Sequence, residues 1–305
     1  MTYIKGGMRP FARIPARNVA HIPTSSGPAV NTPASAATRK RDAVTTVSLV
    51  FLCNCVNTLS VGGVALFLPL IREDLHITFA QAGMLSVAAT ATYALGQIPA
   101  GFLTDRFGPK KLFFIGITGS TAFMLQFGMV GSYEQALVNQ MLTGTFRAFL
   151  FAPGLTLLSS WFPPERRATA MGLYIAANFT GNIILSLVGP LMVLSHTWRF
   201  PFTAFSLTGI AVAVVFFIFA KEQARHASRD PIRLHDLLQL ARYRIVWVAS
   251  ALQIIRMGPV VGISFWLPSF LVADRGLTLQ TAGLVTAMGA ALSAPSNAIG
   301  GYVSD

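Results

Sequence analysis

Charged residues are scarce in this chain. Asp, Glu, Lys and Arg together make up 11% of its 305 residues, whereas about 25% is usual in a soluble domain. Hydrophobic residues make up 53%, which indicates a protein that crosses a lipid bilayer. The net charge of +12 could suggest a nucleic-acid binder. However, the charges separate apolar runs and do not form a polar surface, so no nucleic-acid partner is expected.

Cysteine is nearly absent as well. Cys53 and Cys55 lie in one apolar run, and their C-x-C spacing lacks the second ligand pair of a zinc site. The sequence also offers no nucleophile–base pair, no metal-ligand cluster and no extramembrane domain. These absences argue against a membrane enzyme or receptor, and no cofactor is expected.

Acidic residues are missing from the first 41 positions, which contain seven Lys and Arg residues. An acid-poor, Arg-bearing start can be a mitochondrial transit peptide. Five prolines up to Pro33 would interrupt the amphipathic helix that such a peptide needs. Residues 1–43 are therefore expected to form a disordered, basic cytoplasmic tail, and an over-extended start codon is the alternative.

Eight apolar runs follow, each long enough to cross a bilayer as a helix of about 20 residues. They are continuously apolar, without the alternation of barrel strands, which predicts an all-α membrane protein. The runs are 44–71, 79–103, 112–131, 135–160, 168–194, 200–220, 244–272 and 278–302.

Basic residues are distributed unevenly between the two sides of these runs. The N-terminal segment and every second loop carry 18 Lys and Arg residues, and the other loops carry three. Because basic loops stay in the cytoplasm, the sequence predicts a multi-pass protein of the bacterial inner membrane with a cytoplasmic N-terminus. The longest loop, 221–243, is expected to form a short interfacial helix on the cytoplasmic surface. An ordinary solvated linker is the alternative.

Two segments 200 positions apart resemble each other without a gap. Residues 77–105 and 277–305 share seven identical pairs: Thr78/Thr278, Ala82/Ala282, Gly83/Gly283, Ala91/Ala291, Ala94/Ala294, Gly101/Gly301 and Asp105/Asp305. Such a repeat indicates a transporter built from two similar halves. The second copy ends at Asp305, whereas the first continues into Arg106. This predicts a chain truncated after its eighth helix, and a non-functional fragment is one alternative.

The segment from Gly101 to Lys111, GFLTDRFGPKK, resembles the G-x-L-a-D-r-x-G-r-k/r-x signature of the major facilitator superfamily. The resemblance covers residues 44–305. It implies a six-helix N-terminal bundle (44–220), a linker (221–243), and the first two helices of a C-terminal bundle (244–305).

In that family the signature latches the cytoplasmic gate while the transporter faces outward. The resemblance thus assigns gating roles to Gly101, Asp105, Arg106, Gly108, Lys110, Lys111 and, in the second copy, Asp305. It places Asp105 against helix 11 and Asp305 near the start of helix 5. The alternative is that these charges only retain the loop in the cytoplasm.

A second segment, with Arg147, Pro153-Gly154 and the run from Trp161 to Ala170, is similar to the pattern of anion:cation symporter-like members. Many such members have an acidic residue about two turns after the Arg. Here position 154 is Gly.

Polar side chains are rare within the apolar runs and fall on those that line the cavity in the family. The substrate-binding candidates are Asn57, Tyr93, Gln140, Arg147, Tyr174, Asn178, Gln253 and Arg256, and Asn54 and Asn182 share their helix faces. For the neutral residues the alternative is hydrogen bonding between helices. A buried Arg costs at least ~2.5 kcal/mol, and no acid lies inside the eight runs. An anionic solute would satisfy Arg147 and Arg256 best; backbone carbonyls or an acid on an absent helix are the alternatives.

The sequence therefore predicts a secondary active transporter that moves a small, carboxylate-like organic anion by alternating access. A drug/proton or nitrate-type porter of the same superfamily is the alternative. Proton symport usually uses an acid or His inside the membrane, and neither is evident. Coupling to a proton or another ion, exchange and uniport all stay open.

Overall fold

The computed structural model describes residues 33–223 and 242–304. Over these ranges the chain folds into eight long helices and two short ones. The long helices are α1 (Pro33–Leu66), α3 (Phe79–Phe107), α4 (Pro109–Phe127), α5 (Tyr133–Ser159), α6 (Arg167–Ser195), α7 (Arg199–Phe219), α9 (Arg244–Ala273) and α10 (Leu279–Ser304). The short ones are α2 (Leu68–Asp74) and the 3-10 helix η1 (Pro164–Arg166). The eight long helices correspond to the eight predicted runs, so the predicted all-α fold is confirmed.

Two boundaries differ from the prediction. The first helix begins at Pro33, so the expected disordered tail is wrong for residues 33–43, and residues 1–32 lie outside the described part. The first predicted run is also interrupted, because α1 ends at Leu66 and α2 begins at Leu68. Pro69 has no backbone N–H and its ring crowds the preceding turn, which explains the break at Phe67.

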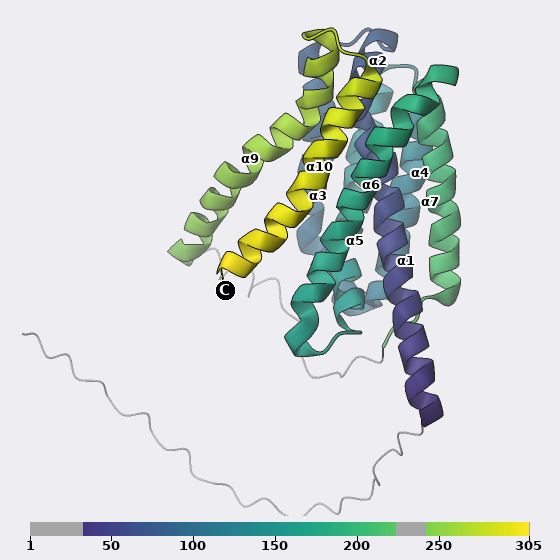
Figure 1. Cartoon of the computed structure of the whole chain (residues 1–305), viewed down its shortest axis with the longest axis vertical. Coiled ribbons are helices and arrows are strands. Elements are labelled where there is room, and N and C mark those ends of the chain that lie inside the picture. Colours follow the sequence, from purple (N-terminus) through teal and green to yellow (C-terminus); the bar gives the residue numbers. More distant parts are fainter. Residues whose placement is uncertain (1–32, 224–241, 305) are drawn as a thin grey trace, which may run out of the picture.

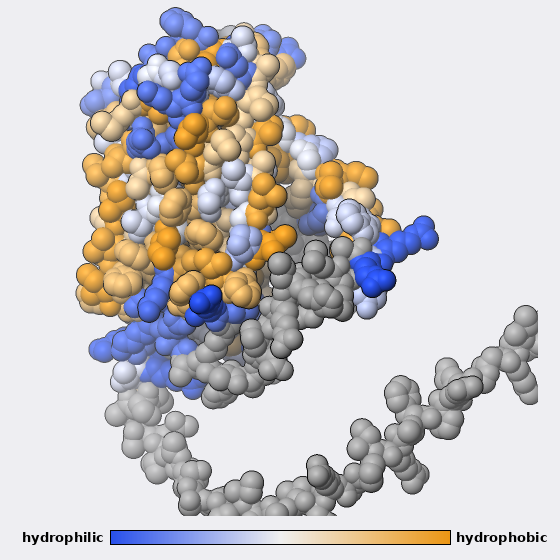
Figure 2. Space-filling view, turned by 180° about the vertical axis from the view of Figure 1, so that it is seen from behind, coloured by the Kyte–Doolittle hydropathy of each residue, from blue (hydrophilic) through white to orange (hydrophobic). Residues whose placement is uncertain are grey.

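Five helices are both long and apolar enough to cross a membrane: α1 from Ala37, α5, α6, α7 and α9. The helices α3 and α4 have the required length, with 29 and 19 residues, but contain no 18-residue stretch as apolar as those of the five. Hydrophobic side chains cover the middle of the molecule and hydrophilic ones gather at both ends (Figure 2). This distribution is the one expected of a helix bundle that spans a bilayer.

Helices α1 and α3 to α7 form one bundle (Figure 1). Its lower end in Figure 1 is where α1 begins, and its upper end is where α2 lies. Near α2, the rings of Phe67, Phe127 and Trp198 surround Phe202 with centroid distances of 5.9, 5.2 and 5.8 Å. Edge-on aromatic packing of this kind fixes how the helices meet.

Close approach of helices depends on small residues. Gly144 of α5 lies directly against α3, and a Cβ atom there would clash with the Ala89 carbonyl oxygen and the Thr92 hydroxyl. Small residues allow such backbone contact between helices in membranes. Any larger side chain at Gly144 would therefore separate α3 from α5.

The helices α9 and α10 contact this bundle mainly at its upper end. The Trp266 ring of α9 packs at a tilt against Phe79 of α3, with centroids 5.9 Å apart, and Gly283 of α10 lies against Ser186 and Pro190 of α6. By contrast, residues 244–264 of α9 are exposed, and the lower end of α9 stands away from the bundle (Figure 1). Over the described residues, the helices therefore meet at the upper end and α9 leaves the lower end open.

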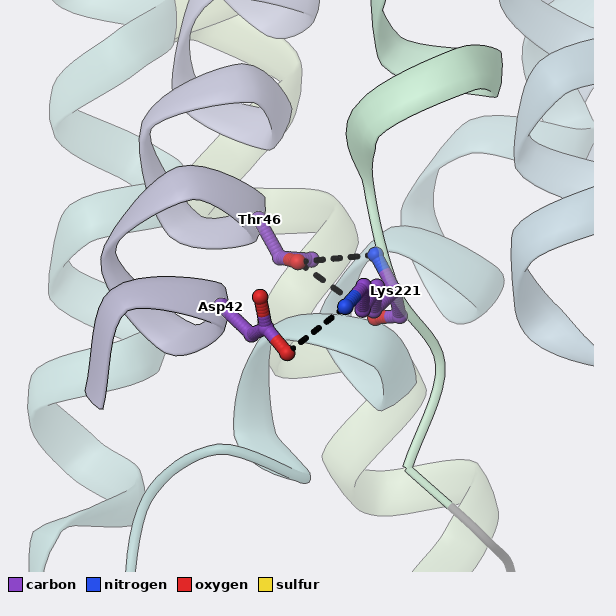
Figure 3. Close-up of polar contacts among 3 residues, drawn as sticks. All are labelled: Asp42, Thr46 and Lys221. Atoms are coloured by element: carbon purple, nitrogen blue, oxygen red, sulfur yellow. Dashed lines mark hydrogen bonds and ion pairs between the residues drawn. The ribbon is translucent and has the colours of Figure 1, made fainter. Parts of the chain in front are cut away.

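The end of α7 is fastened to α1. The Lys221 ammonium lies 3.0 Å from the Asp42 carboxylate, and the Lys221 backbone N–H donates to the Thr46 hydroxyl at 3.0 Å (Figure 3). The Thr46 hydroxyl in turn donates to the Lys221 carbonyl at 3.4 Å. These contacts fix the start of the predicted linker. The interfacial helix predicted within 221–243 falls on 224–241, outside the described residues.

Candidate substrate cavity

Polar side chains from four helices line two adjoining cavities in the middle of the bundle. The first, which we call the inner cavity, measures about 290 Å³ and lies between α1, α3, α5 and α6. Its lining residues are Asn54, Asn57, Thr58, Tyr93, Arg147, Leu150, Phe151, Tyr174, Asn178, Phe179 and Asn182. The second, the α9 cavity, measures about 390 Å³ and is closed on one side by α9. Asn57, Thr58, Arg147, Asn178 and Asn182 line both.

Arg147 lies where the two cavities meet. Its guanidinium carbon is 5.4 Å from the centroid of the Tyr93 ring, and no described side chain accepts a hydrogen bond from it or forms an ion pair with it. A cation–π contact contributes about 0.5–2 kcal/mol, less than a guanidinium needs when its five N–H donors are taken from water. Arg147 is therefore available to an anion that enters the cavities.

The neutral candidates divide into two groups. Asn57 and Gln140 are 6% and 2% exposed and contact α4: the Asn57 amide donates to the Ser120 hydroxyl at 2.8 Å, and the Gln140 amide lies 3.9 Å from the Met124 sulfur. These two contacts join helices, as the alternative interpretation expected. Asn178 is exposed and lines both cavities. Its amide oxygen accepts a hydrogen bond from the Thr58 hydroxyl of α1 at 3.0 Å, and its NH2 group donates to the Tyr174 carbonyl at 3.3 Å.

Position 154 has no room for an acidic residue. A Cβ atom on Gly154 would lie 2.7 Å from the Phe113 ring and 2.8 Å from the Tyr174 ring. These two rings fill the space that a carboxylate would need. Arg147 thus has no acidic neighbour on its own helix, and the Tyr174 ring forms part of the inner cavity wall instead.

Two predicted substrate residues are not brought to the cavities. Arg256 and Gln253 are exposed and line neither cavity, because the lower part of α9 diverges from the bundle. The helix contributes Val260, Val261, Ser264 and Phe265 instead.

Thr58, Ser86 and Thr90 line the α9 cavity without having been predicted. A single Thr or Ser commonly bonds to its own helix, and the Thr58 hydroxyl, which has one proton to donate, lies 3.0 Å from the Asn54 carbonyl as well as from the Asn178 amide oxygen. The sequence therefore gave no signal that separated them from other hydroxyl residues.

The signature segment lies at the lower end of the bundle. Gly108 adopts φ +86°, which favours glycine, and α4 begins at the next residue, Pro109. Asp105, Arg106 and Lys111 are exposed, while the Lys110 ammonium lies 5.4 Å from the Phe217 ring. No atom comes within 4 Å of a Cβ placed on Gly101, so no described helix approaches it. Asp305 lies outside the described residues, and the gating roles stay predictions.

The chain is similar in sequence to curated bacterial transporters. It is 29% identical over 250 residues to a "Probable nitrate/nitrite antiporter" of Thermus thermophilus, covering 77% of this chain and 55% of that protein. It is 26% identical over 292 residues to a "Probable L-galactonate transporter" of Escherichia coli K12, covering 87% of this chain and 62% of that protein. The chain thus spans less than two thirds of the length of these relatives.

Among solved structures, the chain is similar to a bacterial homologue of the human lysosomal transporter Spinster, in an inward-facing and unoccupied conformation. The TM-score is 0.75 at 18% identity, over 87% of this chain and 63% of that one, and this likeness concerns the fold. The sequence model of the Major Facilitator Superfamily matches residues 50–305. The chain therefore belongs to the Major Facilitator Superfamily, as the signature between Gly101 and Lys111 predicted.

Proposed function

We propose that this protein is a secondary active transporter that moves a small organic anion, such as a carboxylate, by alternating access. The observation that carries the proposal is Arg147, a cation within the bundle that has no acidic partner among the described residues and borders both cavities. A guanidinium can bind a carboxylate with two parallel hydrogen bonds. Amide and hydroxyl groups around it can bind the remaining polar atoms of such a solute.

The arrangement of the helices supports alternating access. Contacts between the bundle and α9 and α10 gather at the upper end, and the lower end is open. We propose that the lower end faces the cytoplasm of a bacterial cell, because basic residues gather in the loops of that side. In this orientation the N-terminus is cytoplasmic and the cavities are accessible from inside.

A nitrate-type porter is the second candidate, since one relative carries the name of a nitrate/nitrite antiporter. Nitrate would fill only a small part of a cavity of about 390 Å³ and offers few atoms to the surrounding amides. The size and the neutral polar lining favour a larger, hydroxylated anion. Within the described helices, acidic residues lie at the ends, so we favour exchange of one anion for another over proton coupling.

The test is the binding of D-gluconate to Arg147→Ala and Arg147→Lys variants, measured by calorimetry, with uptake into proteoliposomes as a second readout. We expect Arg147→Ala to weaken binding at least about tenfold and Arg147→Lys to restore it only in part, because an ammonium lacks the planar fork. Arg166→Ala, an exposed cation at the lower end, is the matched control and should bind normally. Unchanged binding by Arg147→Ala would overturn the proposal, and binding of nitrate but not gluconate would favour the second candidate.

A further inference from the structure

The α9 cavity has one polar wall and one apolar wall. The helices α1, α3, α5 and α6 supply Arg147 and a set of amides and hydroxyls. The opposite wall, from α9, consists of Val260, Val261 and Phe265, with Ser264 as its single polar member. A solute in this cavity therefore meets very different surroundings on its two sides.

The lining also carries a single charge. Of the described residues that border the two cavities, Arg147 is the one ionised group. Arg256, the other cation in the middle of a helix, is exposed on α9 and borders neither cavity. One carboxylate is enough to neutralise this lining.

We propose that the cavity selects monocarboxylates over dicarboxylates, with Val260, Val261 and Phe265 of α9 as the residues that determine this specificity. The inference rests on the proposed function, the transport of an organic anion, and adds which anions are accepted. With the first carboxylate on Arg147, the far end of the solute faces α9. A hydroxyl group at that end can bond to Ser264 or to an amide, whereas a second carboxylate finds no cation there.

The apolar wall acts most strongly when α9 closes onto the bundle. In the open form Val260 and Val261 are 56% and 51% exposed, so water can still solvate a second carboxylate. Closure would remove that water, and burying an unpaired carboxylate is costly. The selection against dicarboxylates should therefore be larger in transport than in binding.

D-Gluconate and D-glucarate provide a matched pair of probes, because they share a six-carbon hydroxylated chain and differ in a CH2OH or carboxylate group at one end. We expect the purified 305-residue chain to bind gluconate at least about tenfold more tightly than glucarate by calorimetry. The preference should be larger in proteoliposome uptake. Val261→Arg places a cation in the apolar wall and should reduce the preference about tenfold, whereas Val261→Leu should keep it.

Each outcome decides between the two proposals. Equal binding of the two anions, or tighter binding of glucarate, would overturn the inference and leave the proposed function intact. Binding of neither anion would count against both. If the Val261→Leu and Val261→Arg variants both keep the full preference for gluconate, α9 is not the origin of that preference and the inference is overturned. If a thermal melt shows that Val261→Arg does not fold, Ser264→Lys tests the same wall.

Discussion

Gly154 shows how one residue shapes the surroundings of Arg147. The rings of Phe113 and Tyr174 occupy the space next to it, at 2.7 and 2.8 Å from a Cβ position. The lack of a side chain at 154 thus brings two aromatic rings close to α5. This arrangement leaves the guanidinium without an acid two turns further along its own helix, where the rings stand instead.

Gly154→Ala should destabilise the protein. Its methyl group would overlap the two rings, and overpacking of this kind costs about 1–3 kcal/mol. We expect a lower midpoint of thermal unfolding in detergent. Gly101→Ala is the matched control, because open space surrounds that position and Ala favours a helix by up to about 1 kcal/mol over Gly. A Gly154→Ala protein as stable as the wild type would contradict the packing at this site.

At the scale of the helices, α9 and α10 meet the bundle at the upper end through aromatic and small residues. Trp266 packs at a tilt against Phe79, and the Arg72 guanidinium lies over the Phe79 ring, 3.3 Å from its centroid. The helix α10 comes close to α6 where Gly283 meets the Ser186 carbonyl and Pro190. These contacts depend on shape, and a side chain at Gly283 would keep α10 away from α6.

Gly283→Leu should therefore hold the upper end open. A cysteine introduced at Ser86, which lines the α9 cavity, should react several-fold faster with a membrane-impermeant thiol reagent added from the upper side. Gly289→Leu on the same helix is the control, since a Cβ there meets nothing within 4 Å. Equal labelling rates in the two variants would show that the contact between α6 and α10 does not close this end.

On the scale of the whole molecule, the contacts of Lys221 join the start of α1 to the end of α7. The ion pair with Asp42 is partly exposed, with side-chain exposures of 59% and 18%, and such pairs contribute about 0–1 kcal/mol. Thr46 is fully buried and bonds to both backbone groups of Lys221. Leaving buried backbone groups unpaired costs about 1–3 kcal/mol.

Thr46→Val should accordingly lower the stability more than Asp42→Asn. We expect a loss of about 1 kcal/mol or more for Thr46→Val and less than that for Asp42→Asn, measured by thermal unfolding of the purified protein. Raising the salt concentration should weaken the Asp42 contribution and leave that of Thr46 unchanged. A larger effect of Asp42→Asn would mean that charge, and not the buried hydroxyl, holds the two ends together.

The sequence predicted the helices well because continuous apolar runs between breakers are a strong signal. Proline and glycine marked some helix ends, such as Gly108 before α4, but the break at Phe67 and the extension of α1 to Pro33 were not expected. Arg147, which the sequence predicted to bind substrate, borders both cavities, and its role stays a prediction. The sequence did not separate Arg147 from Arg256, because helix spacing shows which residues share a face and not how far a helix stands from its neighbours.

The contact between α3 and α9, which we call the seam, contains a fluorescent side chain, Trp266. Of the four tryptophans, Trp266 packs on the Phe79 ring of the opposing helix, while Trp198 belongs to the aromatic core around Phe202. Separation of the seam would bring the Trp266 indole into water and move its fluorescence emission to longer wavelengths. The intrinsic emission of the unlabelled protein can therefore follow the opening and closing of its upper end in real time.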